Sequence, residues 1–208
     1  MSAQRNLARI VKLAVGSALV MGLVAAGWAH ADINQAGTTA ANFLSIGSGA
    51  RTLGMGGAIL GFNDDVAGGA WNTAALAWTN GTQMVLSHAG LDDGSSQEWL
   101  GVAGRFGRSR TTWMVSGLYQ GSGTIEGRDD SNVSTGALSV SSFAFGAHVA
   151  HQVTEQFGVG LAAKGVSEQL GDVSGLGMTF DAGATFRTGN LGFGLAGQNI
   201  GGQMRYSG

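Results

Sequence analysis

A period of two residues runs through the chain from Gly81 onward, with large apolar side chains alternating with small or polar ones. The stretch 175–189 shows this most clearly. One set is Leu176, Met178, Phe180, Ala182, Ala184 and Phe186, and the interleaved set is Gly177, Thr179, Asp181, Gly183, Thr185 and Arg187. A helix would mix the two sets, whereas a β-strand turns them to opposite faces. The pattern therefore predicts strands with one apolar face.

Similar sorting recurs along the chain and predicts an antiparallel sheet. Strands are expected at 82–90, 97–107, 110–121, 137–151, 155–169, 175–188 and 190–199, and an eighth is expected to begin at Gln203. The connections at 107–109, 152–154 and 188–190 are short, and those at 91–96, 122–136 and 169–174 are longer. Short turns on one rim and long loops on the other are typical of outer-membrane barrels.

Charged residues are scarce for a protein with a water-exposed surface. They make up 12% of the chain, whereas soluble domains carry about a quarter. Hydrophobic residues make up 44%, and they are scattered rather than gathered into one long segment. This balance suits a barrel that turns apolar side chains to lipid and small or polar ones inward. The net charge of −2 provides no basic excess to attract nucleic acid.

Residues 1–31 are expected to be a cleaved secretory signal peptide. Basic residues precede an apolar stretch at 14–27, and Ala29-His30-Ala31 has the small-x-small pattern of a cleavage site. The apolar stretch is shorter than the roughly 20 residues that span a bilayer, and an uncleaved anchor is the alternative. No later segment is long and apolar enough for a membrane helix, so insertion into a membrane would require a closed sheet.

Residues 32–80 do not follow the period of two and are expected to form a compact, tightly turning plug. Glycines are too frequent in this stretch for a regular helix or strand. A short helix of two or three turns is expected at 66–76, directly after a pair of aspartates that can accept hydrogen bonds at a helix start. The small side chains on one face of 81–208 would leave room for the plug inside a barrel.

Short motifs follow one another in this stretch: FLSIGSGAR, GMGGA, two aspartates and WNTAAL. Together they resemble the N-terminal signature of the PorV/PorQ family, a FadL-like group of outer-membrane β-barrels. The matched positions include Gly49, Ala50, Arg51, Met55, Gly56, Gly57, Asp64, Asp65, Trp71 and Asn72. The chain departs from the signature at Thr73, where the family usually has proline, and at Ala75, where it has glycine. Without the proline, the turn after Asn72 is less rigid.

The resemblance implies an all-β fold, an antiparallel transmembrane β-barrel of fourteen strands around an N-terminal plug with a short helix. About seven or eight strands are expected in 81–208, and fourteen at the same spacing would need on the order of 330 residues. An eight-stranded barrel fills its interior with its own side chains and could not also hold the plug. We therefore expect the chain to be the N-terminal part of a longer barrel.

The resemblance also implies a place in the outer membrane of a Gram-negative type of cell and a link to type IX secretion. Besides lipid, the partners would be secretion-system proteins or exported protein substrates. A FadL-like transporter of hydrophobic small molecules shares the architecture and is the alternative. A soluble secreted β-protein is a second alternative, although a whole apolar face without charges would aggregate in water.

The plug motif suits structural or gating roles. Asp64 and Asp65 fit a helix cap better than a metal or acid–base site, because no other ligands lie at metal spacing. Arg51 is expected to form a salt bridge to the barrel wall, with a ligand carboxylate as the alternative. Trp71 and Asn72 are expected to pin the helix end to the wall, with Asn72 bonding to loop backbone groups.

Four polar residues on the small-residue face are expected to point into the lumen: His148, Lys164, Asp181 and Arg187. His148 is expected to be solvated there. The histidines lack HExxH spacing, and the acidic loop at 122–136 lacks EF-hand spacing, although calcium is an alternative there. The chain has no GxxxxGK[ST] or GxSxG motif and no cysteine, so we expect no cofactor, no metal and no enzymatic activity.

Overall fold

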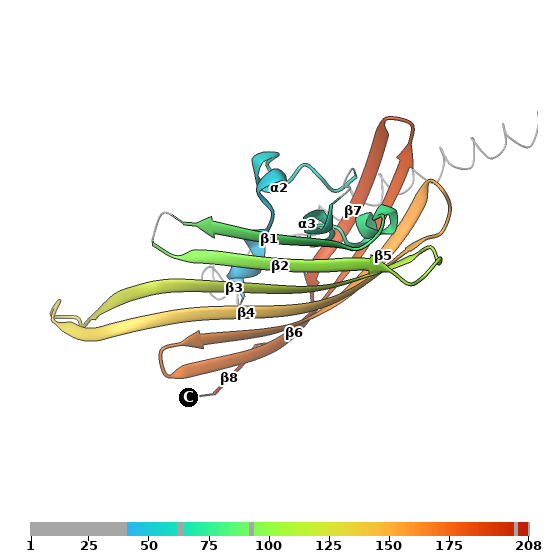
Figure 1. Cartoon of the computed structure of the whole chain (residues 1–208). Helices are drawn as coiled ribbons and strands as arrows, with labels where there is room; N and C mark the ends of the chain where they lie inside the picture. The colour runs from blue at the N-terminus through green and yellow to red at the C-terminus, as the bar shows by residue number, and fades with distance from the viewer. Residues whose placement is uncertain (1–40, 62–64, 92–93, 202–203, 208) are drawn as a thin grey trace, which may run out of the picture. The chain divides into compact units, whose positions relative to one another are not determined.

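The computed structural model describes residues 41–61, 65–91, 94–201 and 204–207. Within them, strands β1 to β7 pair antiparallel in sequence order (Figure 1). The strands are β1 (Gln83–Gly90), β2 (Ser96–Arg105), β3 (Thr111–Arg128), β4 (Ser134–Gln152), β5 (Phe157–Leu170), β6 (Val173–Thr188), β7 (Leu191–Ile200) and β8 (Arg205–Ser207). The expected antiparallel, all-β class is confirmed. The signal peptide expected at 1–31 and the stretch 32–40 lie outside the described residues.

Each strand turns alternate side chains to opposite faces of the sheet. On β4, Phe143 and Phe145 are exposed, whereas Ala144 and His148 are buried. We call the side with exposed apolar residues the outer face, and the opposite, buried side the inner face. The outer face carries Met84, Leu86, Leu100, Val115, Phe143, Phe145, Val149, Leu161, Leu176, Met178, Phe180, Phe193 and Leu195. The separation predicted from the period of two is confirmed.

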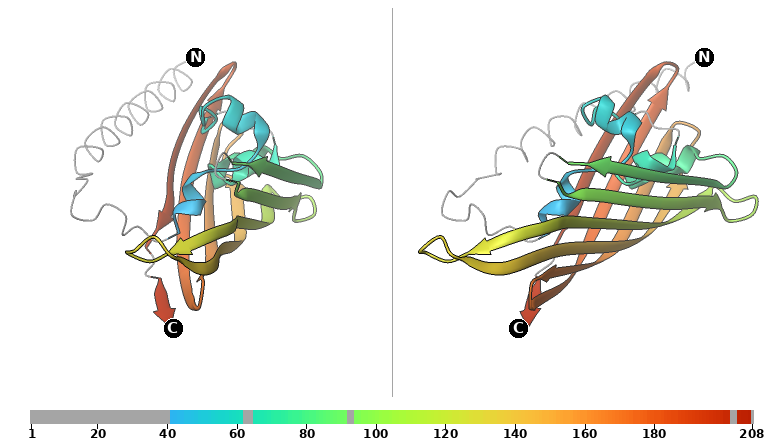
Figure 2. Two further views of the ribbon diagram at one scale, coloured as in Figure 1. Left: turned by 90° about the vertical axis from the view of Figure 1, so that its left-hand side faces the viewer. Right: turned by 60° about the vertical axis from the view of Figure 1, so that its left-hand side comes forward.

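The plug segment, which we define as residues 41–61 and 65–80, forms short helical turns and no strand. They are η2 (Asn42–Ser45), α2 (Ala50–Gly54), α3 (Val66–Gly69) and η3 (Thr73–Trp78). α3 contacts β1 and β2, and η3 contacts β3 to β6, so the segment lies against the inner face (Figure 2). Phe43, Val66 and Leu76 of this segment join Trp99 and Met114 of the sheet in one apolar cluster. No helix in the described part of the chain is long and apolar enough to cross a membrane.

The single helix expected at 66–76 is wrong, because the segment divides into α3 and η3. Asn72 between them has extended backbone angles, φ −146° and ψ 103°, and its side chain accepts a hydrogen bond from the Ala74 N–H. An Asn side chain that bonds to nearby backbone competes with helix continuation.

Within the described residues, two of the three longer loops that we expect, at 122–136 and 169–174, are not observed. Residues expected in a loop at 122–136 mostly continue β3 and β4, which pair as far as Arg128 and Ser134 and leave only 129–133 as a turn. The register shifts at a bulge formed by Ser122 and Gly123, and pairing resumes beyond it: the Ser122 hydroxyl accepts from the Val140 N–H, and Gly123 has φ +65°. The connection between β5 and β6 is likewise only 171–172. Polar residues that resemble a loop in the sequence therefore continue the strands in the structure.

The eighth strand expected from Gln203 is not a separate neighbour in the sheet. β7 pairs with β6 from Thr188 down to Phe180, and β8 then pairs with β6 at residues 174–176 in the same antiparallel sense. β8 therefore lies along the same edge of β6 as β7 and extends that pairing further along β6.

Candidate functional site

Glycines on the inner face form the surface against which the plug segment packs, which we call its seat. A Cβ at Gly160 of β5 would lie 2.5 Å from the Ala74 backbone nitrogen, and one at Gly158 would lie 2.8 Å from the Trp78 ring. A Cβ at Gly183 of β6 would overlap the Asn72 side chain. The small side chains therefore allow η3 to approach the strands at backbone distance.

Asn72 connects three parts of the structure. Its Nδ2 donates to the carbonyl oxygen of Leu60 at 2.9 Å, to the Thr185 hydroxyl at 3.1 Å and to the carbonyl oxygen of Ala184 at 3.4 Å. The Asn72 side chain is buried, and burial raises the cost of losing these bonds. The residue thus joins the loop before α3, the start of η3 and strand β6.

Trp71 organises the glycine-rich part of the plug segment. Its Nε1 donates to the carbonyl oxygen of Ser48 at 2.9 Å. A Cβ at Gly57 would lie 3.1 Å from the ring, and one at Gly47 would overlap it. Gly47, Gly56 and Gly57 have φ values of +83°, +63° and +76°, which other residues rarely adopt. Met55, in contrast, is exposed.

Asp65 and Arg51 interact within the plug segment. Asp65 is the N-cap of α3, and its Oδ1 accepts from the Gly68 N–H at 2.9 Å. Arg51 Nη1 lies 3.8 Å from Asp65 Oδ2, so this ion pair is internal to the segment and not the expected link to the wall. Gly49 precedes α2, whose first residue is Ala50, and a Cβ at Gly49 would lie 2.7 Å from the Ala67 Cβ. Asp64 lies outside the described residues.

Two arginines of the sheet hold the end of η3. Arg105 of β2 donates from Nε to the Thr79 carbonyl at 2.9 Å and from Nη2 to the Ala77 carbonyl at 3.3 Å. The Arg187 guanidinium of β6 lies 4.2 Å from the centre of the Trp78 ring, which is a cation–π contact. The period of two places both arginines on the small-residue face, but it does not indicate what they contact.

A buried ion pair crosses from β5 to β6. Lys164 Nζ lies 2.7 Å from Asp181 Oδ2, and their side chains are 12% and 4% exposed. Opposite Asp181, β7 has a bulge at Gln198 and Asn199. Asp181 Oδ1 accepts from the Asn199 N–H at 2.8 Å, and the Asn199 side-chain oxygen accepts from Lys164 Nζ at 3.1 Å. Gln198 Nε2 donates to the carbonyl oxygen of Ala70 at 2.6 Å, which ties β7 to the plug segment.

His148 is not the solvated residue that we expected, because it is only 2% exposed. Its Nε2 lies 3.0 Å from the Ser116 hydroxyl, and its Nδ1 lies 3.4 Å from the Thr73 hydroxyl. The plug segment covers this part of the inner face and excludes water from the ring. The four residues expected in the lumen all lie on the inner face, and three of them lie close together: His148, Lys164 and Asp181.

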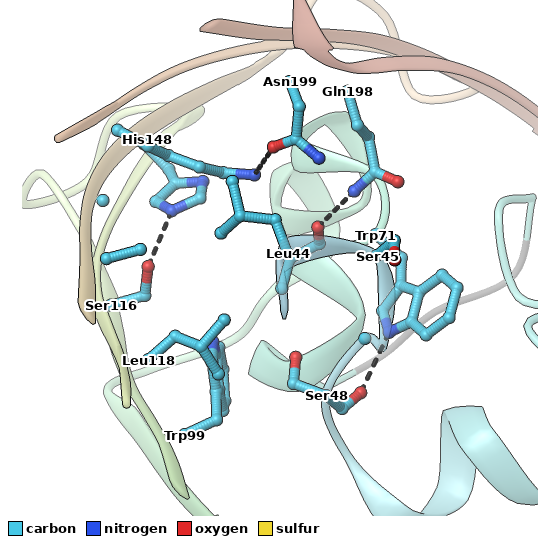
Figure 3. A pocket seen from close by; sticks show the side chains of 15 residues that line it. Leu44, Ser45, Ser48, Trp71, Trp99, Ser116, Leu118, His148, Gln198 and Asn199 are labelled. Atoms are coloured by element: carbon cyan, nitrogen blue, oxygen red, sulfur yellow. Dashed lines mark hydrogen bonds between the residues drawn. The ribbon is translucent and has the colours of Figure 1, made fainter. Parts of the chain in front are cut away.

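A cavity of about 240 Å³ remains between the plug segment and the sheet. One side is lined by Trp71 and by four residues of the plug segment, Leu44, Ser45, Gly47 and Ser48. Inner-face residues of β2 to β5 line the other side, and Gln198 and Asn199 of β7 close one end (Figure 3). Strand register orders the sheet side into rows. One row is Trp99, Leu118 and Ala144, and the next, two residues further along each strand, includes Ser116, Gly146 and Lys164.

The described residues contain no group of three or more His, Cys, Asp or Glu side chains that could hold a metal ion. In the acidic turn, Glu126 pairs with Arg128 at 2.8 Å, and Asp129 accepts from the N–H groups of Ser131 and Val133. These carboxylates already have partners within the hairpin.

No protein-family model matches the chain, and no curated protein matches it either.

Proposed function

We propose that this chain is an outer-membrane β-barrel protein of the PorV/PorQ type, which takes part in type IX secretion or in surface delivery of exported proteins. The observation that carries the proposal is the distribution of side chains on the sheet. Large apolar residues are exposed on the outer face, including Leu161 at 67%, while the Lys164 and Asp181 side chains on the inner face are only 12% and 4% exposed. In water this arrangement would be costly, whereas lipid favours it.

The plug segment supports the same proposal. A barrel of this type has a segment inside it, and here the small inner-face residues receive η3 at backbone distance. In a closed barrel the outer edges of β1 and β7 are both paired, because an unpaired strand edge is not tolerated in hydrocarbon.

The orientation follows from the connection of the plug segment to β1. If the plug enters from the periplasm, the rim at 106–110, 153–156 and 189–190 is periplasmic, and the hairpin of β3 and β4 extends on the cell surface. The hairpin continues past Gly121, the last β3 residue paired with β2, and thus offers a surface to exported proteins.

Membrane fractionation tests the location. The mature protein should sediment with the outer membrane and resist extraction by high salt, and recovery from the soluble periplasm would overturn the proposal. In a host with a type IX system, replacing 124–138 by a short turn should reduce surface delivery of exported proteins without loss of membrane insertion. If the protein without the hairpin inserts into the membrane and surface delivery is unchanged, the hairpin does not contact exported proteins, and the proposed role in delivery is contradicted.

A FadL-like transporter of hydrophobic small molecules is the second candidate, and the cavity beside the plug segment favours it. Deletion of the gene should then abolish uptake of a labelled hydrophobic compound and leave protein delivery intact. The opposite result would favour the secretion role.

A further inference from the structure

The cavity beside the plug segment has two chemically different ends. The row of Trp99, Leu118 and Ala144 offers apolar surface, and Leu44 of the plug segment also lines the cavity (Figure 3). The adjacent row and the β7 bulge offer polar groups, from Lys164 and Asn199. Because two residues along a strand correspond to about 7 Å, one small molecule can contact both rows.

The polar end carries no net charge. The Lys164 ammonium is matched by the Asp181 carboxylate at 2.7 Å, and the two side chains are only 12% and 4% exposed. A ligand carboxylate would have to share Lys164 with Asp181, and two buried carboxylates at one ammonium repel each other. The polar end therefore disfavours anions, although it contains a lysine.

A hydrogen-bond donor remains available at this end. An ammonium group has three N–H donors. Among the described residues, Asp181 and the Asn199 side chain take two of those of Lys164. The third can donate to an uncharged oxygen, as found in an alcohol, a phenol or a ketone.

The volume limits the size of the apolar part. An apolar cavity of about 150 Å³ in another protein holds benzene. A volume of about 240 Å³ accommodates one or two fused rings with a polar substituent.

We propose that this cavity is a binding site for small uncharged molecules that combine a ring or compact apolar body with one hydrogen-bond-accepting oxygen. The apolar body lies against Trp99, Leu118 and Leu44, and the oxygen accepts from Lys164. The site goes beyond the proposed role in protein delivery and gives the second candidate, the transporter, a specific ligand class. It distinguishes uncharged ligands from carboxylates of the same size.

The test compares 2-naphthol with 2-naphthoate at neutral pH on the purified full chain, folded in detergent, by calorimetry and by quenching of tryptophan fluorescence. We expect saturable binding of 2-naphthol at least about tenfold tighter than that of 2-naphthoate, because only the anion must compete with Asp181. Equal binding of the two, or tighter binding of the naphthoate, would overturn the proposal.

Two alanines of β4 provide matched variants that control for partition into detergent. Ala144 is buried and lines the cavity, whereas Ala147 is exposed on the outer face of the same strand. Ala144→Leu should weaken 2-naphthol binding by about tenfold or more, because it fills the space, and Ala147→Leu should leave binding unchanged. If both variants bind alike, the cavity is not the site.

Asp181→Asn reverses the expected preference. Lys164 then has no carboxylate partner in this cluster, and 2-naphthoate should gain affinity relative to 2-naphthol. If the folded variant still prefers 2-naphthol to the same extent, the ion pair does not set the preference for uncharged ligands. If the variant does not fold, the comparison of Ala144→Leu with Ala147→Leu still tests whether the ligand binds in the cavity. Because binding is measured on purified protein, its failure leaves the outcome of membrane fractionation unaffected.

Discussion

The two faces of the sheet differ in what their side chains contact, although the same strands form both. On β5, Gly160 on the inner face lies beneath the backbone of η3, whereas a Cβ at Gly165 on the outer face would meet nothing within 4 Å. The ion pairs differ in the same way: Lys164 and Asp181 are buried on the inner face, while His88 and Glu98 form an exposed pair on the outer side of β1 and β2. The loss of folding stability caused by a substitution therefore depends on the face of the sheet as well as on the residue type.

The largest expected effect is at the buried ion pair. Lys164→Met should destabilise the fold by about 3–5 kcal/mol, because it leaves the Asp181 carboxylate buried without its counter-ion. The double variant Lys164→Met with Asp181→Leu should recover most of this loss. On the outer face, His88→Ala should cost less than about 1 kcal/mol, because His88 lies two residues before the end of β1, near the rim that water reaches, and exposed pairs contribute little. Urea unfolding in detergent measures the free energy of unfolding of all three variants. Equal losses of stability for Lys164→Met and His88→Ala would contradict the difference between the two faces.

The next effect tests whether the outer face meets lipid. Leu161→Arg on β5 should cost about 2–4 kcal/mol if this position lies near the middle of the bilayer. In a water-soluble protein the same change at so exposed a position would cost almost nothing. Folding titrations in lipid vesicles measure the difference, and an unchanged folding free energy there would contradict a lipid-facing outer surface.

A pair of glycine variants on β5 comes third. Gly160→Ala should destabilise the fold by about 1–3 kcal/mol, because the added methyl group must displace η3. Gly165→Ala should be neutral or slightly stabilising, since alanine loses less backbone entropy than glycine in a strand. The two thermal unfolding curves should separate clearly, and superimposed curves would mean that η3 does not rest on this part of β5.

The smallest expected effect is local to the plug segment. Asp65→Ala removes the N-cap of α3 and should cost about 1 kcal/mol, whereas Asp65→Asn retains an acceptor and should cost less. Binding of 2-naphthol in the cavity should persist in both variants. A loss as large as that of Lys164→Met would show that Asp65 contributes more than a helix cap.

Much of the strand pattern could be predicted, because the alternation of side chains is a local consequence of the extended backbone. The strand ends are predicted wrongly where polar residues continue a strand. Glu126 and Arg128 look like loop residues, but they pair with β4 as an antiparallel ladder. Composition cannot reveal such pairing, since backbone hydrogen bonds depend on the partner strand. The division of the segment 66–76 at Asn72 has a local cause, because the Asn72 side chain accepts from the Ala74 N–H, but its bond to Thr185 far along the chain has no local signal.

The candidate site was predictable only in part. His148, Lys164 and Asp181 could be assigned to the inner face from the period of two, but neither the ion pair nor the burial of His148 could be. The β7 bulge had one weak signal, two successive polar residues at Gln198 and Asn199 in an otherwise alternating strand. Their contacts depend on strand register and on the position of the plug segment.

The sequence by itself determined which residues are extended and how their side chains divide between two faces, because the strand geometry repeats every two residues. Only the tertiary structure decided what each inner-face residue touches. The seat of η3, the ion pair of Lys164 and Asp181, and the cavity with its uncharged polar end all join segments that are distant in the chain. Such contacts follow from register and packing, which no local pattern encodes.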